Sequence, residues 1–385
     1  MLLSNTIPLT ISFLVLSIWL YLWLGHAGFW RIDREPAPPT PPEWPPVVVV
    51  IPARDEEAGI SETLRSLWMQ TYPVAMRIVL VDDHCADRTV ELAQSTAREL
   101  GHESELQIVS ANPLPPGWTG KVWAMNEGIT RGIAQAEEAQ YVLLSDADIS
   151  HGKNAVRELV CRAEVGACDL TSFMVRLQCR SAAEKLMIPA FVFFFKMLYP
   201  FRRINDASDA LAGAAGGTML VRRTALDRIG GMESIRGELI DDCALAREIK
   251  RGGRSIWVGL SEESVSTREY GRLSEIVHMI ARTAYTQLGY SPVRLAGCVT
   301  GLVLVYLAPV LLLFRGGWTS IIAAATVLIM ASLYLPMVRF YRQSPAWSLL
   351  LPVTATLYLY ATILSAWRTH AGRGGQWKGR SRVLN

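Results

Sequence analysis

The segment VVVVIPARDEE, residues 47–57, places an uninterrupted apolar, mostly β-branched run directly before a cluster of carboxylates. Such a run, with no polar side chain in it, is typical of a strand that is covered on both faces of a sheet. Similar short strands are predicted at residues 77–81, 106–110 and 141–144, and helical spacing appears at residues 60–70 and 87–100. This alternation predicts an α/β fold with a mainly parallel central sheet.

Carboxylates follow three of the four predicted strands. They are Glu56 after the first strand, Asp82 and Asp83 after the second, and Asp146 and Asp148 after the fourth. Because the carboxyl ends of parallel strands meet at one edge of a sheet, where ligands bind, we expect these side chains to lie close together. An alternative for any single carboxylate is that it caps the helix that follows.

The pair Asp146 and Asp148 has the spacing of a metal site for a phosphorylated ligand. Mg²⁺ and Mn²⁺ bind through one or two carboxylates and complete their shells with phosphate oxygens and water. In the segment GKVWAMN, Lys121 and Asn126 add a cation and a polar group, although these residues also suit an ordinary helix N-terminus.

Two further segments carry candidate ligands or catalytic groups. The glycine-rich AGAAGGTMLVRR, residues 212–223, contains Gly217, where backbone can approach a ligand closely, or it is simply a turn before a strand. Asp241 and Asp242 precede a predicted helix at residues 243–251. One of them suits the general base that takes a proton from an attacking hydroxyl, and the other suits a helix N-cap.

The two ends of the chain are strongly apolar. Residues 7–30 form one nearly uncharged run, and residues 295–314, 318–338 and 347–367 form three more, each about 20 residues long and so long enough to span a bilayer. We therefore expect an N-terminal anchor at residues 1–30, a stiff proline-rich linker at 31–46, a catalytic domain at 47–293, about three membrane helices at 294–367 and a basic tail at 368–385.

The charges flanking these runs set the expected topology. Arg31 follows the first run, which places the middle domain in the cytoplasm and the N-terminus outside. Three further spans would then leave the tail, with Lys378, Arg380 and Arg382, on the outer side, against the same rule. Either one of the four segments is re-entrant or interfacial, or the positive-inside rule fails for this chain. The sequence does not decide between these two topologies.

Composition excludes several other classes. A net charge of +3 without a basic, aromatic stripe does not indicate nucleic-acid binding. The six cysteines lack CxxC spacing, so neither a disulfide framework nor a zinc site is expected, and reduced thiols in a cytoplasmic domain are the simpler interpretation.

In their order along the chain, VVVVIPARDEE, LVDDHCADRT, GKVWAMNEG, LLSDADI, GGTMLVRRTALDRIGG and ELIDDCALAREIKRGG resemble a family 2 glycosyltransferase over residues 47–265. The resemblance implies a GT-A fold and inverting sugar transfer from a nucleotide-sugar donor with a divalent cation. It implies that Pro52, Glu56 and Asp82 or Asp83 contact the nucleoside. Asp146 and Asp148 would then hold the metal and diphosphate, and Asp242, beside Asp241, would be the base.

The chain departs from the QxxRW motif of processive family members. The nearest stretch, HMIARTAYTQ, keeps an arginine, Arg282, but no tryptophan. This departure counts against polymer synthesis, and the resemblance leaves Arg282 as a diphosphate contact. The RTAYTQLGYSP stretch and the arrangement of anchors most resemble the glycosyltransferases associated with hopanoid biosynthesis. This implies a hopanoid or polyprenyl-type lipid acceptor in a bacterial inner membrane. The phenylalanine-rich residues 184–203 suit either a helix at the membrane interface or a buried core helix.

Two other functions fit parts of the pattern. A catalytically inactive scaffold would keep the fold, but retention of all the acidic positions argues against it. A nucleotidyltransferase also uses acids and metal on a similar sheet, but its glycine-rich, lysine-bearing loop is absent after the first strand.

Overall fold

The structure is a computed structural model that describes residues 2–33, 35–133 and 138–375. It divides into two compact units. The helical unit comprises residues 2–33, 179–202 and 270–374, and the α/β unit comprises residues 35–133, 138–178, 203–269 and 375. Residues 179–202 and 270–293, which we expected in the catalytic domain, therefore group with the apolar helices.

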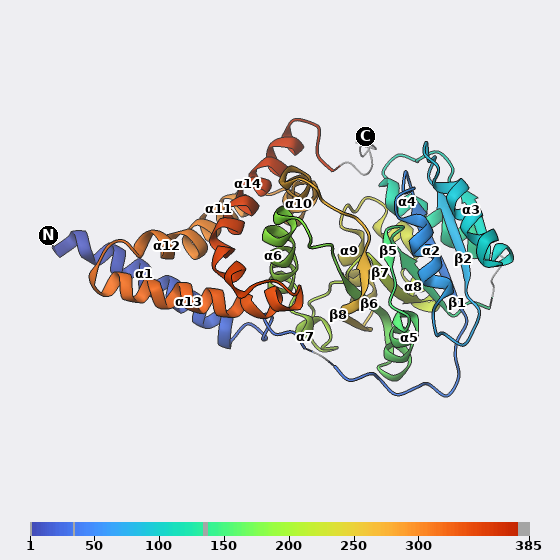
Figure 1. Ribbon diagram of the computed structural model, residues 1–385, viewed down its shortest axis with the longest axis horizontal. Helices are drawn as coiled ribbons and strands as arrows, with labels where there is room; N and C mark the ends of the chain where they lie inside the picture. The colour runs from blue at the N-terminus through green and yellow to red at the C-terminus, as the bar shows by residue number, and fades with distance from the viewer. Residues whose placement is uncertain (1, 34, 134–137, 376–385) are drawn as a thin grey trace. The chain divides into compact units, whose positions relative to one another are not determined.

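One eight-stranded sheet forms the centre of the α/β unit, in the order β3-β2-β1-β4-β7-β6-β8-β5 (Figure 1). The strands are β1 (Val47–Ala53), β2 (Arg77–Asp82), β3 (Leu106–Ser110), β4 (Tyr141–Ser145), β5 (Ile149–Ser150), β6 (Cys168–Arg176), β7 (Thr218–Arg222) and β8 (Ser255–Ser266). The four strands predicted from apolar runs are confirmed as β1 to β4, and these four pair in parallel.

The sheet is mixed, and the expectation of a mainly parallel sheet is not confirmed. In the described chain, β7 pairs antiparallel with both β4 and β6, and β5 pairs antiparallel with β8. The sequence does not reveal this change of direction, because a short strand buried on both faces has the same apolar pattern in either orientation.

Helices cover the sheet and connect its strands. They are α2 (Ile60–Trp68), α3 (Thr89–Leu100), α4 (Gly120–Glu127), α5 (Ala155–Val165), α7 (Phe201–Ile204), α8 (Arg223–Arg228) and α9 (Asp241–Arg251). All seven residues of β1 are buried, and its apolar side chains share a core with α2 and α5 that includes Ile60, Leu64 and Leu159. The sheet edge that carries the polar residues is thus anchored to a close-packed interior.

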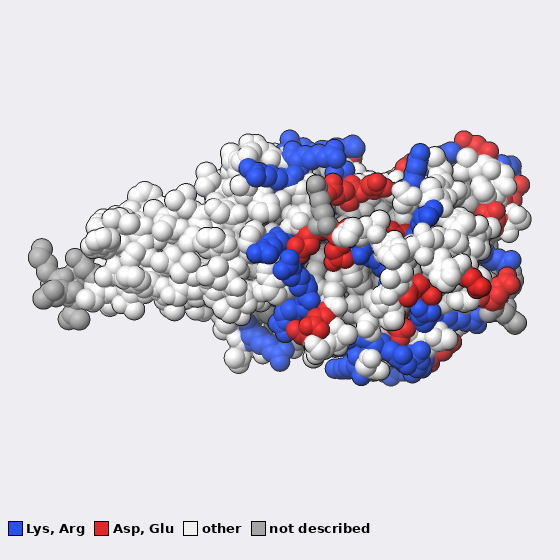
Figure 2. Space-filling model, turned by 90° about the horizontal axis from the view of Figure 1, so that it is seen from below, with Lys and Arg blue, Asp and Glu red and all other residues white. Residues whose placement is uncertain are grey.

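The helical unit contains α1 (Leu2–Leu24), α6 (Ala182–Leu198), α10 (Leu273–Gln287), α11 (Pro292–Leu302), α12 (Ala308–Leu312), α13 (Gly317–Phe340) and α14 (Leu351–His370). Among the residues that the structure describes, four helical segments are long and apolar enough to cross a membrane, by length and composition: Thr6–Leu24, Pro292–Leu312, Gly317–Phe340 and Pro345–His370. On the face drawn in Figure 2, the surface of the apolar helices is nearly free of charge, whereas charges of both signs cover the α/β unit.

Helix α6 comes from the middle of the chain, so the helical unit is not built from the chain ends alone. Its Phe193 ring packs 5.2 Å from the ring of Tyr334, and its Phe194 ring packs 4.7 Å from that of Tyr358. Both phenylalanines are buried. These contacts support the core-helix interpretation of this segment.

Candidate active site at the sheet edge

Parallel pairing brings the predicted carboxylates to one edge of the sheet. Strand β1 lies between β2 and β4, so all three strands end side by side. The backbone N–H of Asp83 donates to the carbonyl of Ala53 at the end of β1, at 2.9 Å, while Asp146 follows β4 directly. The placement that we expected from strand ends is therefore observed for these two residues.

The turn that carries Asp146 and Asp148 is held by hydrogen bonds from three directions. The N–H of Asp146 donates to the carbonyl of Gly217 at 3.2 Å, and Thr63 Oγ1 donates to the carbonyl between the two aspartates at 2.8 Å. Thr267 donates to the carbonyl of Asp148 through its N–H at 2.7 Å and its hydroxyl at 3.0 Å. The turn is therefore fixed before any ligand binds.

Lys121 connects this turn to the aspartate pair at the start of α9. Its Nζ lies 2.8 Å from Asp146 Oδ1 and 3.2 Å from Asp241 Oδ2. Burial disfavours the charge of Lys121, but the two carboxylates outweigh it and raise the pKa of the lysine above its ordinary value. Lys121 is thus a permanent cation between the predicted metal site and the predicted base.

Arg268, which the sequence did not single out, neutralises the other side of the turn. Its Nε lies 3.2 Å from Asp148 Oδ2, and its Nη2 lies 3.4 Å from Glu56 Oε2. Burial, followed by the charge of Asp146, raises the pKa of Asp148 to about 6, and Arg268 opposes that increase. Each aspartate of the turn therefore has its own cation.

Asp242 is held by backbone donors rather than by a side-chain cation. Its Oδ2 accepts the N–H of Gly216 at 2.9 Å, and its Oδ1 accepts the N–H of Cys243 at 2.7 Å. Burial raises the pKa of Asp242 to about 6, the charge of Asp241 adds to this increase, and Lys121 opposes it. A carboxylate with a pKa near the working pH suits proton transfer.

Gly216 allows this approach because it has no side chain. A Cβ atom at Gly216 would lie 3.2 Å from Asp242 Oδ2 and 3.4 Å from Lys121 Nζ, tighter than ordinary contact with the first of these atoms. The sequence pointed to Gly217 instead, which packs against Ile149 and Val175. Of these two glycines, Gly216 is the one beside Asp242, and the ligand contact of Gly217 stays a prediction.

The residues fit a divalent cation. One oxygen of Asp146 faces Lys121 and one oxygen of Asp148 faces Arg268. Within the described residues, the second oxygen of each carboxylate has no hydrogen-bond or ion-pair partner, and the Asp146 side chain is 35 % exposed. Two carboxylate oxygens are a donor set that Mg²⁺ or Mn²⁺ accepts when phosphate and water complete the shell.

The residues predicted to contact a nucleoside lie at the ends of β1 and β2. Pro52 is buried within β1. Asp83 is fully buried, and Arg54 Nη1 donates to its carbonyl at 2.7 Å and lies 3.4 Å from its carboxylate. The carboxylate of Asp82 accepts the N–H of Cys85 at 2.8 Å, so it stabilises the turn after β2. Of the two aspartates, Asp83 is the one paired with an arginine.

Two predicted residues have weaker structural support. Asn126 lies on α4 and is partly buried, and its carbonyl accepts the hydroxyl of Thr130 at 2.8 Å. Arg282 lies on α10 in the helical unit and is exposed. Their roles in ligand binding stay predictions.

His151 lies buried behind the turn and was not predicted. Its Nε2 is 2.9 Å from Ser145 Oγ, and that hydroxyl donates to the carbonyl of Asp146 at 3.0 Å. Burial lowers the pKa of His151 to about 4, so the ring is neutral near pH 7. No sequence motif relates His151 to the turn, because the contact between His151 and Ser145 forms only in the folded chain.

A second cluster, Asp55, Cys85 and Asp87, brings possible ligand atoms within 4.8 Å of one another. Asp55 accepts the N–H of Ala86 at 2.7 Å, and Asp87 accepts that of Glu57 at 3.0 Å. Burial raises the pKa of the Cys85 thiol to about 12, which keeps it protonated and a poor metal ligand. These carboxylates stabilise turns.

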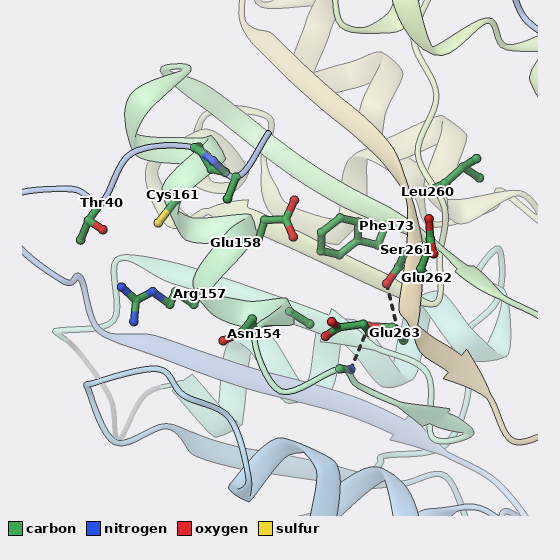
Figure 3. Close-up of a pocket in the computed structure, with 15 residues that line it drawn as sticks. Thr40, Asn154, Arg157, Glu158, Cys161, Phe173, Leu260, Ser261, Glu262 and Glu263 are labelled. Atoms are coloured by element: carbon green, nitrogen blue, oxygen red, sulfur yellow. Dashed lines mark hydrogen bonds between the residues drawn. The ribbon is translucent and has the colours of Figure 1, made fainter. Parts of the chain in front are cut away.

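A cavity of about 460 Å³ in the α/β unit lies away from the predicted site residues. It is formed by the proline-rich segment at residues 37–40, the start of α5 and the loop at residues 260–264 (Figure 3). Glu158 points into it in Figure 3, and this carboxylate also pairs with Arg162 at 2.9 Å. None of the residues predicted from strand ends lines this cavity.

Comparison with known proteins shows which proteins this chain resembles. A mannosyltransferase from Pyrobaculum calidifontis, solved in complex with GDP-Man and Mn²⁺, has a similar fold with a TM-score of 0.55 and 17 % identity, covering 97 % of this chain and all of that one. The undecaprenyl-phosphate 4-deoxy-4-formamido-L-arabinose transferase of Pseudomonas aeruginosa is 32 % identical over 122 residues, 31 % of this chain and 33 % of that protein. The beta-monoglucosyldiacylglycerol synthase of Trichormus variabilis is 24 % identical over 191 residues, 49 % of this chain and 38 % of that protein.

The chain thus spans well under half the length of these two curated relatives. A family model, by contrast, matches residues 9–382, nearly the whole chain. The comparisons confirm a glycosyltransferase, but they confirm neither family 2 specifically nor a hopanoid-associated subgroup. The chain belongs to Glycosyl transferase family 21.

Proposed function

We propose that the protein is a membrane-bound, inverting glycosyltransferase that moves a sugar from a nucleotide-sugar donor to a lipid acceptor. The observation that carries the proposal is the position of Lys121, 2.8 Å from Asp146 and 3.2 Å from Asp241. It joins the acids suited to a metal and diphosphate with the acids suited to a base. The catalytic domain in this proposal is the α/β unit, and it lies on the cytoplasmic side of a bacterial inner membrane.

A divalent cation held by Asp146 and Asp148 supplies positive charge for the diphosphate leaving group. Lys121 and Arg268 add two fixed positive charges for the diphosphate, since Lys121 already contacts Asp146 and Arg268 already contacts Asp148. Arg54, held in place by the buried Asp83, and Glu56 bind the nucleoside at the ends of β1 and β2, next to Pro52.

Asp242 takes the proton as the acceptor oxygen attacks the anomeric carbon and the bond to the diphosphate breaks. A single displacement of this kind, without a covalent sugar–enzyme intermediate, inverts the configuration. The reaction needs one base, and Asp242, fixed by the N–H groups of Gly216 and Cys243, is that base.

Two relatives support a lipid acceptor: one is an undecaprenyl-phosphate arabinose-type transferase, and the other is a glucosyldiacylglycerol synthase. The four apolar helical segments among the described residues also support it. A buried base favours an acceptor with a hydroxyl group, because a phosphate acceptor is already ionised. A hopanoid with a free hydroxyl fits this chemistry, and a polyprenyl phosphate is the competing acceptor.

The proposal is tested with membranes that contain the full chain. They are incubated with a panel of labelled nucleotide sugars, and the lipid extract is analysed by mass spectrometry. We expect one donor to give a glycolipid whose mass identifies the acceptor, and the product to disappear with EDTA. Donor binding without product for every sugar would favour the inactive scaffold, and transfer of a nucleotidyl group would favour the nucleotidyltransferase.

Arg268 provides a separate prediction about donor binding. Arg268→Gln removes the cation beside Asp148 and Glu56, so we expect the KM for the donor to rise roughly ten- to hundredfold, the range of one charge-assisted hydrogen bond, with a smaller change in kcat. Arg88→Gln is the matched control, because the Arg88 side chain pairs with Glu91 on an exposed face. An unchanged KM in Arg268→Gln would remove Arg268 from the donor site.

A further inference from the structure

Helix α14 differs in direction from α1 and α13 in the helical unit. In Figure 1, α1 and α13 run alongside each other, whereas α14 crosses their direction. Helix α14 packs most extensively against α10, and it also contacts α6 and the α11–α12 segment. Neither α6 nor α10 is a candidate span. Thr354 Oγ1 donates to the carbonyl of Leu186 on α6 at 3.1 Å, and Ser365 Oγ accepts the N–H of Tyr285 on α10 at 3.0 Å.

These hydrogen bonds show that α14 has an inner face, which packs within the helical unit, and an outer face. Its inner face contains the polar residues that bond to α6 and α10, including Tyr358, whose hydroxyl donates to the carbonyl of Met187 at 3.4 Å. Its outer face is a stripe at helical spacing, which we call the outer stripe: Val353, Thr356, Tyr360, Ile363 and Trp367. Tyr360 is 57 % exposed and Trp367 is 60 % exposed.

The composition of the outer stripe is that of the membrane interface. Tyrosine and tryptophan concentrate where acyl chains meet headgroups, because each has an apolar ring and a polar atom. Arg368 follows Trp367 directly, and Arg373 follows the end of the helix, so cations lie next to the aromatic end of the stripe. A basic, aromatic and apolar helix end of this kind binds anionic lipid.

The helical unit carries an excess of basic residues, and their positions indicate which helix ends face the cytoplasm. Its described residues include 13 lysines and arginines and 3 acids, a difference of 13 − 3 = +10. Arg31 follows α1, Arg294 lies in the first turn of α11, and Arg339 is at the end of α13, whereas the turn between α12 and α13 carries only Arg315. By the positive-inside rule, the first three positions face the cytoplasm.

We infer that α14 does not cross the membrane and instead lies in the cytoplasmic headgroup region, with its outer stripe against acyl chains and its basic end on anionic phospholipid headgroups. The chain then crosses three times, through α1, the α11–α12 segment and α13. Arg368 and Arg373 stay on the side of Arg31 and Arg339. This resolves the conflict between four spans and a basic tail, and it does not depend on sugar transfer.

Topology reporters on the full chain test this inference. A short tag inserted after Gly316, between α12 and α13, and a reporter fused after Asn385 are probed in separate variants with an impermeant reagent in intact cells. We expect the tag at Gly316 to be accessible from outside and the C-terminal reporter to be protected. Both positions accessible from the same side would mean that α14 spans the membrane and would overturn the inference.

Photo-crosslinking tests the lipid contact itself. A photoreactive residue replaces Ile363 in the outer stripe and, as the control, Leu328 in the middle of α13, which is 63 % exposed. The purified full chain is placed in nanodiscs with equal anionic and zwitterionic lipid. At Ile363 we expect anionic adducts to exceed zwitterionic ones by roughly fivefold, the effect of one cation near the surface, and at Leu328 no preference. Equal labelling at Ile363, or adducts with protein alone, would contradict the headgroup assignment.

Discussion

Asp242→Asn is expected to lower kcat for sugar transfer by about 10²- to 10⁴-fold, the usual contribution of a general base. The substitution keeps the size of the side chain, but its single oxygen can accept the N–H of either Gly216 or Cys243, and its NH₂ group then faces the other N–H. Since Asp242 takes no part in the contacts that Lys121 makes with Asp146, donor binding should be nearly unchanged. The measurement is a pair of experiments on the purified full chain: initial rates and equilibrium binding of the labelled donor.

The matched comparison is Asp241→Asn. Asp241 lies 3.2 Å from Lys121, so its loss should alter the lysine and weaken donor binding, while Asp242 remains able to accept a proton. Asp242→Asn should therefore mainly lower kcat, whereas Asp241→Asn should mainly raise the dissociation constant for the donor. Full turnover in Asp242→Asn would assign the base to another residue.

The pH dependence of kcat gives a second readout of the same prediction. Burial and the charge of Asp241 raise the pKa of Asp242 to about 6. A base must be deprotonated to accept a proton, so kcat should be constant well above pH 6 and should fall as the pH drops through 6. This acidic limb should be absent from the residual rate of Asp242→Asn. A limb of the same midpoint in the variant would show that another group controls it.

The parts of the site that the sequence predicted are local ones. An apolar run followed by carboxylates determines that a strand ends there, and parallel neighbours bring such ends together. Asp83 and Asp146 therefore lie where we expected them. Asp242 was predicted by resemblance, and its backbone partners, Gly216 and Cys243, appear only in three dimensions.

Arg268 could not be predicted because its contacts are not local. It follows β8, which joins the sheet beside β6, and its partner Glu56 is 212 positions away in the chain. An arginine after a strand is too common to indicate a site. The antiparallel β7 escaped prediction for a related reason: the direction of a buried strand depends on its neighbours, not on its own apolar residues.

Apolar helices present the same difficulty in the other unit. Hydropathy and length make both α13 and α14 candidate spans, but α14 crosses the direction of α13. What separates them is which residues each helix packs against. Only the tail charges gave a sequence-based sign that the four apolar runs are not equivalent.

Removing the metal site should have the second large effect. In Asp148→Asn, the turn keeps its hydrogen bonds from Thr267 because these involve the backbone carbonyl of residue 148. The charge that holds a divalent cation is lost, however, and Arg268 is left with only Glu56 as its acidic partner among the contacts described above. A metal ion contributes several kcal/mol to charge stabilisation in such reactions, so we expect the rate to fall by roughly 10²- to 10³-fold.

The decisive measurement is the dependence of the initial rate on Mn²⁺ or Mg²⁺ concentration after treatment with EDTA. The unsubstituted chain should lose activity with EDTA and recover it on adding metal, whereas Asp148→Asn should need far more metal for half-maximal rate. Glu99→Gln is a fitting control, because it also removes one acidic charge but from an exposed pair with Arg65. If transfer survives EDTA in the unsubstituted chain, Asp146 and Asp148 act as hydrogen-bond partners of Lys121 and Arg268, and these two cations alone stabilise the diphosphate. The same experiment therefore separates two ways of neutralising one leaving group.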